Sequence, residues 1–214
     1  MKTDLTDITV VMDRSGSMSS CAAEAEGGLN HFIEEQKQAA GDAVFSLVQF
    51  DDHYDVVCEG VPIQDAPVCK LEPRGMTALL DAVGKTINTV GLRLAAMDEA
   101  DRPGLVIMVI LTDGMENSSQ EFTKAQVKDM IEHQQSKYNW KFIFLGANQD
   151  AFSEGGSIGI QASSTANFDI DKIGVAYQAT SASISRARAS HHLPAAARDI
   201  EYTDEERKAM KKKG

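Results

Sequence analysis

Residues 105–112 are the most restrictive segment of this sequence, because they read Leu-Val-Ile-Met-Val-Ile-Leu-Thr without a charged side chain. An apolar run of this length predicts a β-strand. Since both alternating sets of side chains are apolar, the strand must be covered on both faces, which is typical of a parallel sheet lying between helices. Residues 105–112 therefore predict an α/β fold in which they form a strand of the buried sheet.

Apolar runs and helical periodicities alternate along the rest of the chain. Further strands are predicted at 7–13, 43–50, 55–63 and 140–147. Apolar side chains at steps of three and four predict helices over 24–39, 79–98 and about 170–188, the last following a Gly- and Ser-rich segment at 153–165. Thr123 and Gln126 fit a capping box, which predicts the start of one more helix.

This alternation predicts a doubly wound, mostly parallel, Rossmann-like sheet with helices on both faces. The turn 51–55 is short enough for an antiparallel pair, and Gly60 and Pro62 suit a strand at a sheet edge. We therefore expect 55–63 to be an antiparallel edge strand. In the strand order 3-2-1-4-5, the strands 7–13 and 105–112 would be neighbours at the switch point of the sheet.

The length of 214 residues suits one compact domain, and 43% apolar with 25% charged residues is ordinary globular composition. We expect residues 1–190 to form that domain. Residues 191–214 are expected to be a mobile tail, with a short helix opened by Thr203 and Glu206 before a lysine run.

Charge and hydropathy exclude two classes of partner. The formal net charge of −11 disfavours binding to a phosphate backbone, so no nucleic-acid partner is expected. The sequence contains neither an apolar run of membrane-spanning length nor a signal-peptide pattern at its start. Cys21, Cys58 and Cys69 are odd in number and lack metal-type spacing, so free thiols and a cytoplasmic location are expected.

Hydroxyls and carboxylates gather where two predicted strands end. The strand 7–13 runs into Asp13-Arg14-Ser15-Gly16-Ser17, and the strand 105–112 is followed by Asp113. The carboxyl ends of neighbouring parallel strands meet at one edge of the sheet, where ligands bind. Oxygen donors without histidine or thiolate suit Mg²⁺ or Mn²⁺. We therefore expect a divalent-metal site at this edge.

The residues resemble the metal-ion-dependent adhesion site (MIDAS) of von Willebrand factor type A (VWA) domains. That motif is D-x-S-x-S, a later threonine, and an aspartate after the central strand. The matching residues are Asp13, Ser15, Ser17, Thr77 and Asp113, and the resemblance covers about residues 5–190. It implies an ion held by both serine hydroxyls and, depending on state, by Thr77, with the aspartates acting directly or through water.

The resemblance also implies a function. One coordination position would stay open for an Asp or Glu side chain of a partner protein, as in a protein-interaction module or adaptor that is not an enzyme. The compact form looks like the stand-alone bacterial or phage cytoplasmic type, whose members work beside AAA+ ATPases, kinase-like proteins or stress-response proteins. Asp51, Asp52, Glu116 and Asp150 are hypothesised to lie on the same rim and to repel an acidic partner until metal binds.

Other interpretations of the same residues stay open. Ser15, Ser17 and Thr77 could be turn residues and a helix cap. A metal-dependent phosphohydrolase of the haloacid dehalogenase type also starts from an aspartate at the first strand, but it needs an acid where this chain has Ser15. A structural or assembly protein, for example of a phage particle, could hold a metal only for stability. Residues 167–172 imitate a calcium loop but lack its later glycine and glutamate, which predicts a helix-start loop.

Overall fold

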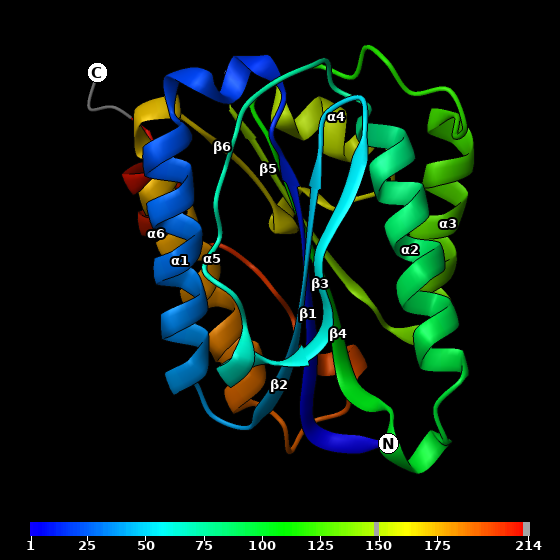
Figure 1. Ribbon diagram of the computed structural model, residues 1–214. Helices are drawn as coiled ribbons and strands as arrows, with labels where there is room; N and C mark the ends of the chain where they lie inside the picture. The colour runs from blue at the N-terminus through cyan, green and yellow to red at the C-terminus, as the bar shows by residue number, and fades with distance from the viewer. Residues whose placement is uncertain (148–149, 212–214) are drawn as a thin grey trace.

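A computed structural model describes residues 1–147 and 150–211. Its centre is a six-stranded sheet in the order β3-β2-β1-β4-β5-β6 (Figure 1). All neighbouring strands are parallel except β2 and β3, which form an antiparallel pair. The strands are β1 (Lys2–Asp13), β2 (Asp42–Phe50), β3 (Tyr54–Pro62), β4 (Pro103–Thr112), β5 (Lys141–Ala147) and β6 (Thr165–Phe168).

Helices cover both faces of the sheet, as Figure 1 shows. α1 and α5 pack together on one face, whereas α2 and α3 lie on the other. The α-helices are α1 (Ala22–Gln38), α2 (Leu79–Ala95), α3 (Lys124–Tyr138), α4 (Ala151–Ser157), α5 (Ile173–Ala189) and α6 (Asp204–Ala209). Within the described residues, no helix combines the length and the apolar character that crossing a membrane requires.

The sheet separates two apolar cores. Every residue of β4 is buried, which confirms the expectation drawn from its uninterrupted apolar run. On β1, Val10 and Met12 belong to the core beneath α1 and α5, whereas Val11 between them belongs to the core beneath α2 and α3. Alternate side chains of one strand thus stabilise both layers, and this anchors the end of β1 in the middle of the molecule.

The predicted fold class and strand order are confirmed, including the antiparallel edge strand β3. α4 and β6 were not predicted, because both lie in or beside the Gly- and Ser-rich segment 153–165, where no helical or strand periodicity was recognised. Asp150 caps α4 by accepting a hydrogen bond from the Ser153 backbone N–H at 3.2 Å. β6 is only four residues long and forms because β5 supplies a partner edge.

Residues 191–211 differ from the expected separate tail. Ile200, Tyr202 and Met210 are buried in the core that contains α1 and α5. The predicted capping box of Thr203 and Glu206 is present and opens α6. The segment is therefore packed as part of the domain, because its apolar side chains fill space beside α5 and β6. Two residues of the lysine run, Lys212 and Lys213, lie outside the described residues.

Candidate metal centre

Asp13 closes β1 and is fully buried at the carboxyl edge of the sheet. Its Oδ1 accepts a hydrogen bond from the Ser15 backbone N–H, and its Oδ2 accepts one from Thr112 Oγ1, each at 2.6 Å. These two bonds fix the carboxylate between the loop after β1 and the last residue of β4. The strand order therefore brings the ends of β1 and β4 together, as the sequence predicted.

The two serines of the loop after β1 lie beside Asp113. Ser17 Oγ donates to Asp113 Oδ1 at 2.6 Å, and Ser15 Oγ lies 3.0 Å from Ser17 Oγ. Ser15 is buried, whereas Ser17 is exposed at the start of a 3-10 turn. The loop thus presents one inner and one outer hydroxyl next to a carboxylate that comes from a different strand.

Thr77 completes the convergence, and Gly114 marks the point where the hydroxyls meet. A Cβ atom placed on Gly114 would lie 3.0 Å from Thr77 Oγ1, 3.4 Å from Ser17 Oγ and 3.7 Å from Ser15 Oγ. Three hydroxyl oxygens from two loops therefore surround one small volume that glycine leaves open. The structure brings all five residues of the predicted site together.

Thr77 is held by its backbone. Its N–H donates to Asn117 Oδ1 at 2.9 Å, and its carbonyl accepts from the Asn117 N–H at 3.0 Å. Helix α2 begins after Ala78 without a side-chain cap, so the interpretation of Thr77 as a helix cap is wrong. Glu116 caps the start of α2 in part, since its Oε2 accepts a hydrogen bond from the Leu80 N–H at 2.9 Å. The hydroxyl of Thr77 is thereby left facing the serines.

The site concentrates unfavourable negative charge. The pKa of Asp13 is raised to about 6, mainly by burial and in smaller part by the nearby Asp113, against the hydrogen bonds from Thr112 and Ser15. Burial likewise raises the pKa of Asp113 above its ordinary value, against the bond from Ser17. Two desolvated carboxylates next to hydroxyl donors form an oxygen set that fits a hard divalent cation, which would offset their repulsion.

Several residues that build the site had no signal in the sequence. Thr112 and Asn117 orient Asp13 and Thr77 through the hydrogen bonds given above, and each looks like an ordinary strand or loop residue in the sequence. Arg14 and Arg74 both bind the buried Asp51 beside the site. Only tertiary contacts identify these roles.

Asp51 differs from the other three carboxylates expected to repel an acidic partner. It is fully buried between two arginines, which offset its charge. Glu116 accepts backbone hydrogen bonds, and Asp150, which is exposed, caps α4. The side chain of Asp52 is 43% exposed. Asp51, Asp52 and His53 lie close enough to share an ion, but the arginines on Asp51 disfavour a cation there. The convergence at Gly114 is the better candidate metal centre.

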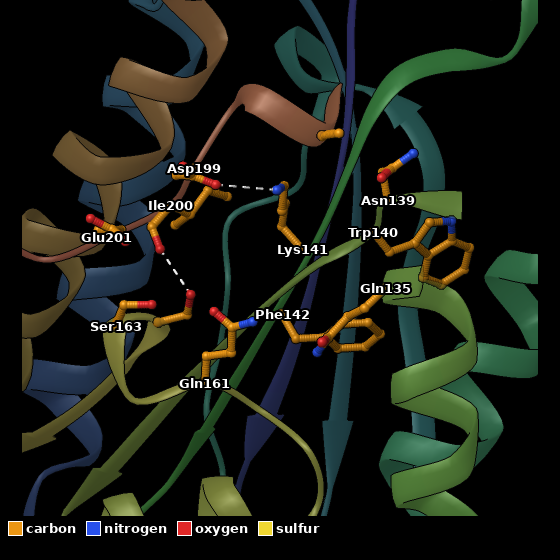
Figure 2. Close-up of a pocket in the computed structure, with 12 residues that line it drawn as sticks. Gln135, Asn139, Trp140, Lys141, Phe142, Gln161, Ser163, Asp199, Ile200 and Glu201 are labelled. Atoms are coloured by element: carbon orange, nitrogen blue, oxygen red, sulfur yellow. Dashed lines mark hydrogen bonds and ion pairs between the residues drawn. The ribbon is translucent and has the colours of Figure 1, made fainter. Parts of the chain in front are cut away.

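A separate hollow lies at the opposite edge of the sheet, where β5 begins. It has a volume of about 250 Å³. Lys141 Nζ lies 3.6 Å from Asp199 Oδ1, and Figure 2 shows these two side chains facing each other. Its walls come from the end of α3, the start of β5, residues 161–164 before β6 and the segment before α6. It contains none of the five predicted metal ligands.

Comparison with known proteins gives matches to solved structures alone: the sequence matches no protein-family model and no curated protein. The pilus adhesin SpaC from Lactobacillus rhamnosus GG, in its open conformation, matches with a TM-score of 0.64 at 14% identity, over 85% of this chain and 30% of SpaC. The mussel byssus proximal thread matrix protein 1, with a zinc-occupied MIDAS motif, matches with a TM-score of 0.58 at 15% identity, over 81% of this chain and 46% of that chain. A von Willebrand factor type A protein from Catenulispora acidiphila matches with a TM-score of 0.57 at 15% identity, over 85% of this chain and 42% of that chain.

These likenesses show the fold: a mostly parallel six-stranded sheet with one antiparallel strand and flanking helices, which is the Rossmann-like fold of VWA domains. This chain spans less than half the length of each of these solved chains.

Proposed function

We propose that this chain is a metal-dependent protein-interaction module without enzymatic activity. Asp13, Ser15, Ser17, Thr77 and Asp113 would hold the ion, and a partner protein would complete its coordination with an Asp or Glu side chain. The observation that carries this proposal is the convergence of three hydroxyls on the space beside Gly114, next to two buried carboxylates. A fold shared with VWA domains supports it.

The donor set explains how such a site would recognise an acidic partner. Hydroxyl oxygens are neutral, so an ion bound mainly by Ser15, Ser17 and Thr77 keeps much of its positive charge. When bound, the ion supplies a strong and directional bond to an incoming carboxylate. Because every donor is an oxygen, we propose Mg²⁺ or Mn²⁺, although the MIDAS motif of the mussel byssus protein holds zinc.

The finer parts of the proposal concern cellular context. We propose an adaptor of the bacterial or phage cytoplasmic type, with an AAA+ ATPase, a kinase-like protein or a stress-response protein as its partner. The resemblance at Asp13–Ser17, Thr77 and Asp113 supports this choice, and identification of the partner would decide it.

The test is metal-dependent capture. The protein is immobilised, exposed to bacterial lysate in Mg²⁺ and eluted with EDTA, beside columns of Asp113→Ala and Asp129→Ala. Asp129 is an exposed carboxylate on α3, so its loss matches the charge change away from the site. We expect a partner that EDTA releases from the wild-type and Asp129→Ala columns and that the Asp113→Ala column does not retain.

Two other results would replace the proposal. Mg²⁺-stimulated hydrolysis of phosphoesters that Asp13→Asn abolishes would indicate a phosphohydrolase. A regular homo-oligomer that forms equally well after alanine substitution of Ser15 and Ser17 would indicate an assembly protein whose metal serves stability.

A further inference from the structure

Asp51 joins two loops beside the candidate metal centre through both of its neighbouring arginines. Arg14 Nε donates to Asp51 Oδ2 at 3.0 Å, and Arg74 Nε donates to the same oxygen at 2.8 Å. Arg14 also pairs with Asp55. We call Arg14, Asp51 and Arg74 the arginine clamp. Arg14 lies between the predicted ligands Asp13 and Ser15, and Arg74 lies three residues before Thr77.

Backbone hydrogen bonds also join the three segments that contain Arg14, Asp51 and Arg74. The Arg74 N–H donates to the Arg14 carbonyl at 2.8 Å, and the Gly16 N–H donates to the Gly75 carbonyl at 3.2 Å. The Ala78 N–H donates to the Asp51 carbonyl at 2.9 Å. Gly75 has a φ of 66°, a conformation that glycine adopts without strain. The clamp therefore sets how the chain enters and leaves the segment that contains Thr77.

The burial of the clamp makes stability a poor explanation for it. Asp51 is fully buried, and the Arg14 side chain is only 9% exposed. Burying an ion pair costs desolvation energy that can exceed the gain from its attraction, so an apolar replacement of similar volume often serves stability as well. Arg74 adds a second cation to the same oxygen while remaining 56% exposed. The arrangement fixes how the loop after β1 and the segment 74–78 lie relative to each other.

We propose that Arg74 and Asp51 are positioning residues for Thr77: they hold the segment 74–78 against the loop after β1, so that Thr77 Oγ1 faces Ser15 and Ser17. This inference rests on the proposed function, because it assigns the clamp to the same metal site. Neither residue would touch the ion. Their effect passes through the placement of the Thr77 hydroxyl.

The direction in which Arg74→Ala changes metal affinity distinguishes a positioning role from a purely electrostatic one. Arg74→Ala removes a positive charge near a cation site, so electrostatics alone would strengthen metal binding. A positioning role predicts the opposite. We expect Arg74→Ala to weaken Mn²⁺ binding by about 10- to 100-fold, the range found when groups that orient metal ligands are removed.

Isothermal titration with Mn²⁺ on the full chain tests this in a double-mutant cycle. Arg74→Ala is compared with wild type, and Arg74→Ala/Thr77→Ala with Thr77→Ala. Lys70→Ala is the control, because Lys70 is another exposed cation paired with a carboxylate, Glu26. We expect Arg74→Ala to weaken Mn²⁺ binding when Thr77 is present, and to change it by less than about twofold when Thr77 is replaced by alanine. Lys70→Ala should leave Mn²⁺ binding unchanged.

Circular dichroism of each variant verifies the fold. Should Arg74→Ala unfold, Arg74→Lys replaces it: lysine keeps the charge and lacks the Nε donor, so electrostatics alone predicts unchanged Mn²⁺ binding whereas positioning predicts weaker binding. Unchanged or tighter Mn²⁺ binding by the Arg74 variant, or equal weakening in both backgrounds, would overturn the positioning role. Mn²⁺ binding by the wild type would leave the proposed function standing in that case. A wild-type chain that binds no Mn²⁺ would overturn both.

Discussion

Ser17 and Asp113 are 96 residues apart in the chain, yet the Ser17 hydroxyl donates to Asp113 Oδ1 at 2.6 Å. The contact exists because β1 and β4 are parallel neighbours, so both chains leave the sheet at the same edge. In open α/β sheets this edge, at the switch point of the strand order, is where ligands bind. The contact therefore joins the two halves of the candidate metal centre.

Divalent metal should stabilise the wild-type chain against heat. At a hundredfold excess of Mg²⁺ over the dissociation constant, binding to the folded state adds about 2.7 kcal/mol to the free energy of unfolding. Ser17→Ala and Asp113→Ala remove donors and should lose this gain. Thermal unfolding in Mg²⁺ and in EDTA measures it. An Mg²⁺ gain that both variants retain would place the ion elsewhere in the protein.

Gly114→Ala should block the site without unfolding the protein. The new methyl group would lie 3.0 Å from Thr77 Oγ1 and occupy the space where the hydroxyls converge. Gly114 has no positive φ, so alanine fits its backbone. We expect Mn²⁺ titration to show no binding, with the free energy of unfolding in EDTA within about 1 kcal/mol of wild type.

Gly91→Ala is the matched control for that substitution. A Cβ on Gly91 meets nothing within 4 Å, and Gly91 lies inside α2. Alanine there should raise the free energy of unfolding by about 0.5–1 kcal/mol and leave Mn²⁺ binding unchanged. Normal Mn²⁺ binding by Gly114→Ala would contradict the location of the site.

Asp81 should make stability depend on acid pH. Its burial raises the pKa, but hydrogen bonds from the Gln120, Phe122 and Glu121 N–H groups outweigh this and hold it below 3.8. The ionised carboxylate therefore contributes stability above pH 3.8, and this contribution is lost as pH falls below that value.

Asp81→Asn should accordingly lower the free energy of unfolding by about 1–3 kcal/mol at neutral pH. The difference from wild type should shrink on acidification below 3.8, the pKa of an unperturbed aspartate. Urea unfolding at a series of pH values measures both quantities. A difference that stays constant down to pH 2 would show that the charge of Asp81 contributes nothing.

The segment after α5 should contribute to global stability. Tyr202 is buried, and its hydroxyl lies 2.7 Å from Thr180 Oγ1 on α5. Tyr202→Ala should cost about 3–5 kcal/mol, as for other large aromatic truncations, and Tyr202→Phe about 1 kcal/mol. Leu193→Ala, at a side chain 39% exposed, is the control and should change stability by less than about 0.5 kcal/mol. A mobile tail would instead give no loss for Tyr202→Ala.

The sequence by itself determined the fold class, because hydrophobic periodicity is a local property. The uninterrupted apolar run at 105–112 required a strand buried on both faces, and β4 is that strand. The capping boxes at Thr123 and Thr203 predicted helix starts correctly, since each is made within four residues. Asp13 and Asp113 were expected at one edge because parallel strands share their direction.

Only the tertiary structure decided the details that depend on contacts between distant segments. β6 exists because β5 offers an unpaired edge, and Tyr202 is buried because α5 leaves room beside it. The hydroxyls of Ser15, Ser17 and Thr77 meet beside Gly114, and Asn117 binds the backbone of Thr77 there. Asn117 is 40 residues from the Thr77 that it binds, and Asp51 is 23 residues from its partner Arg74. Periodicity and local motifs report on neighbours in the chain, whereas these hydrogen bonds join residues that become neighbours only after folding.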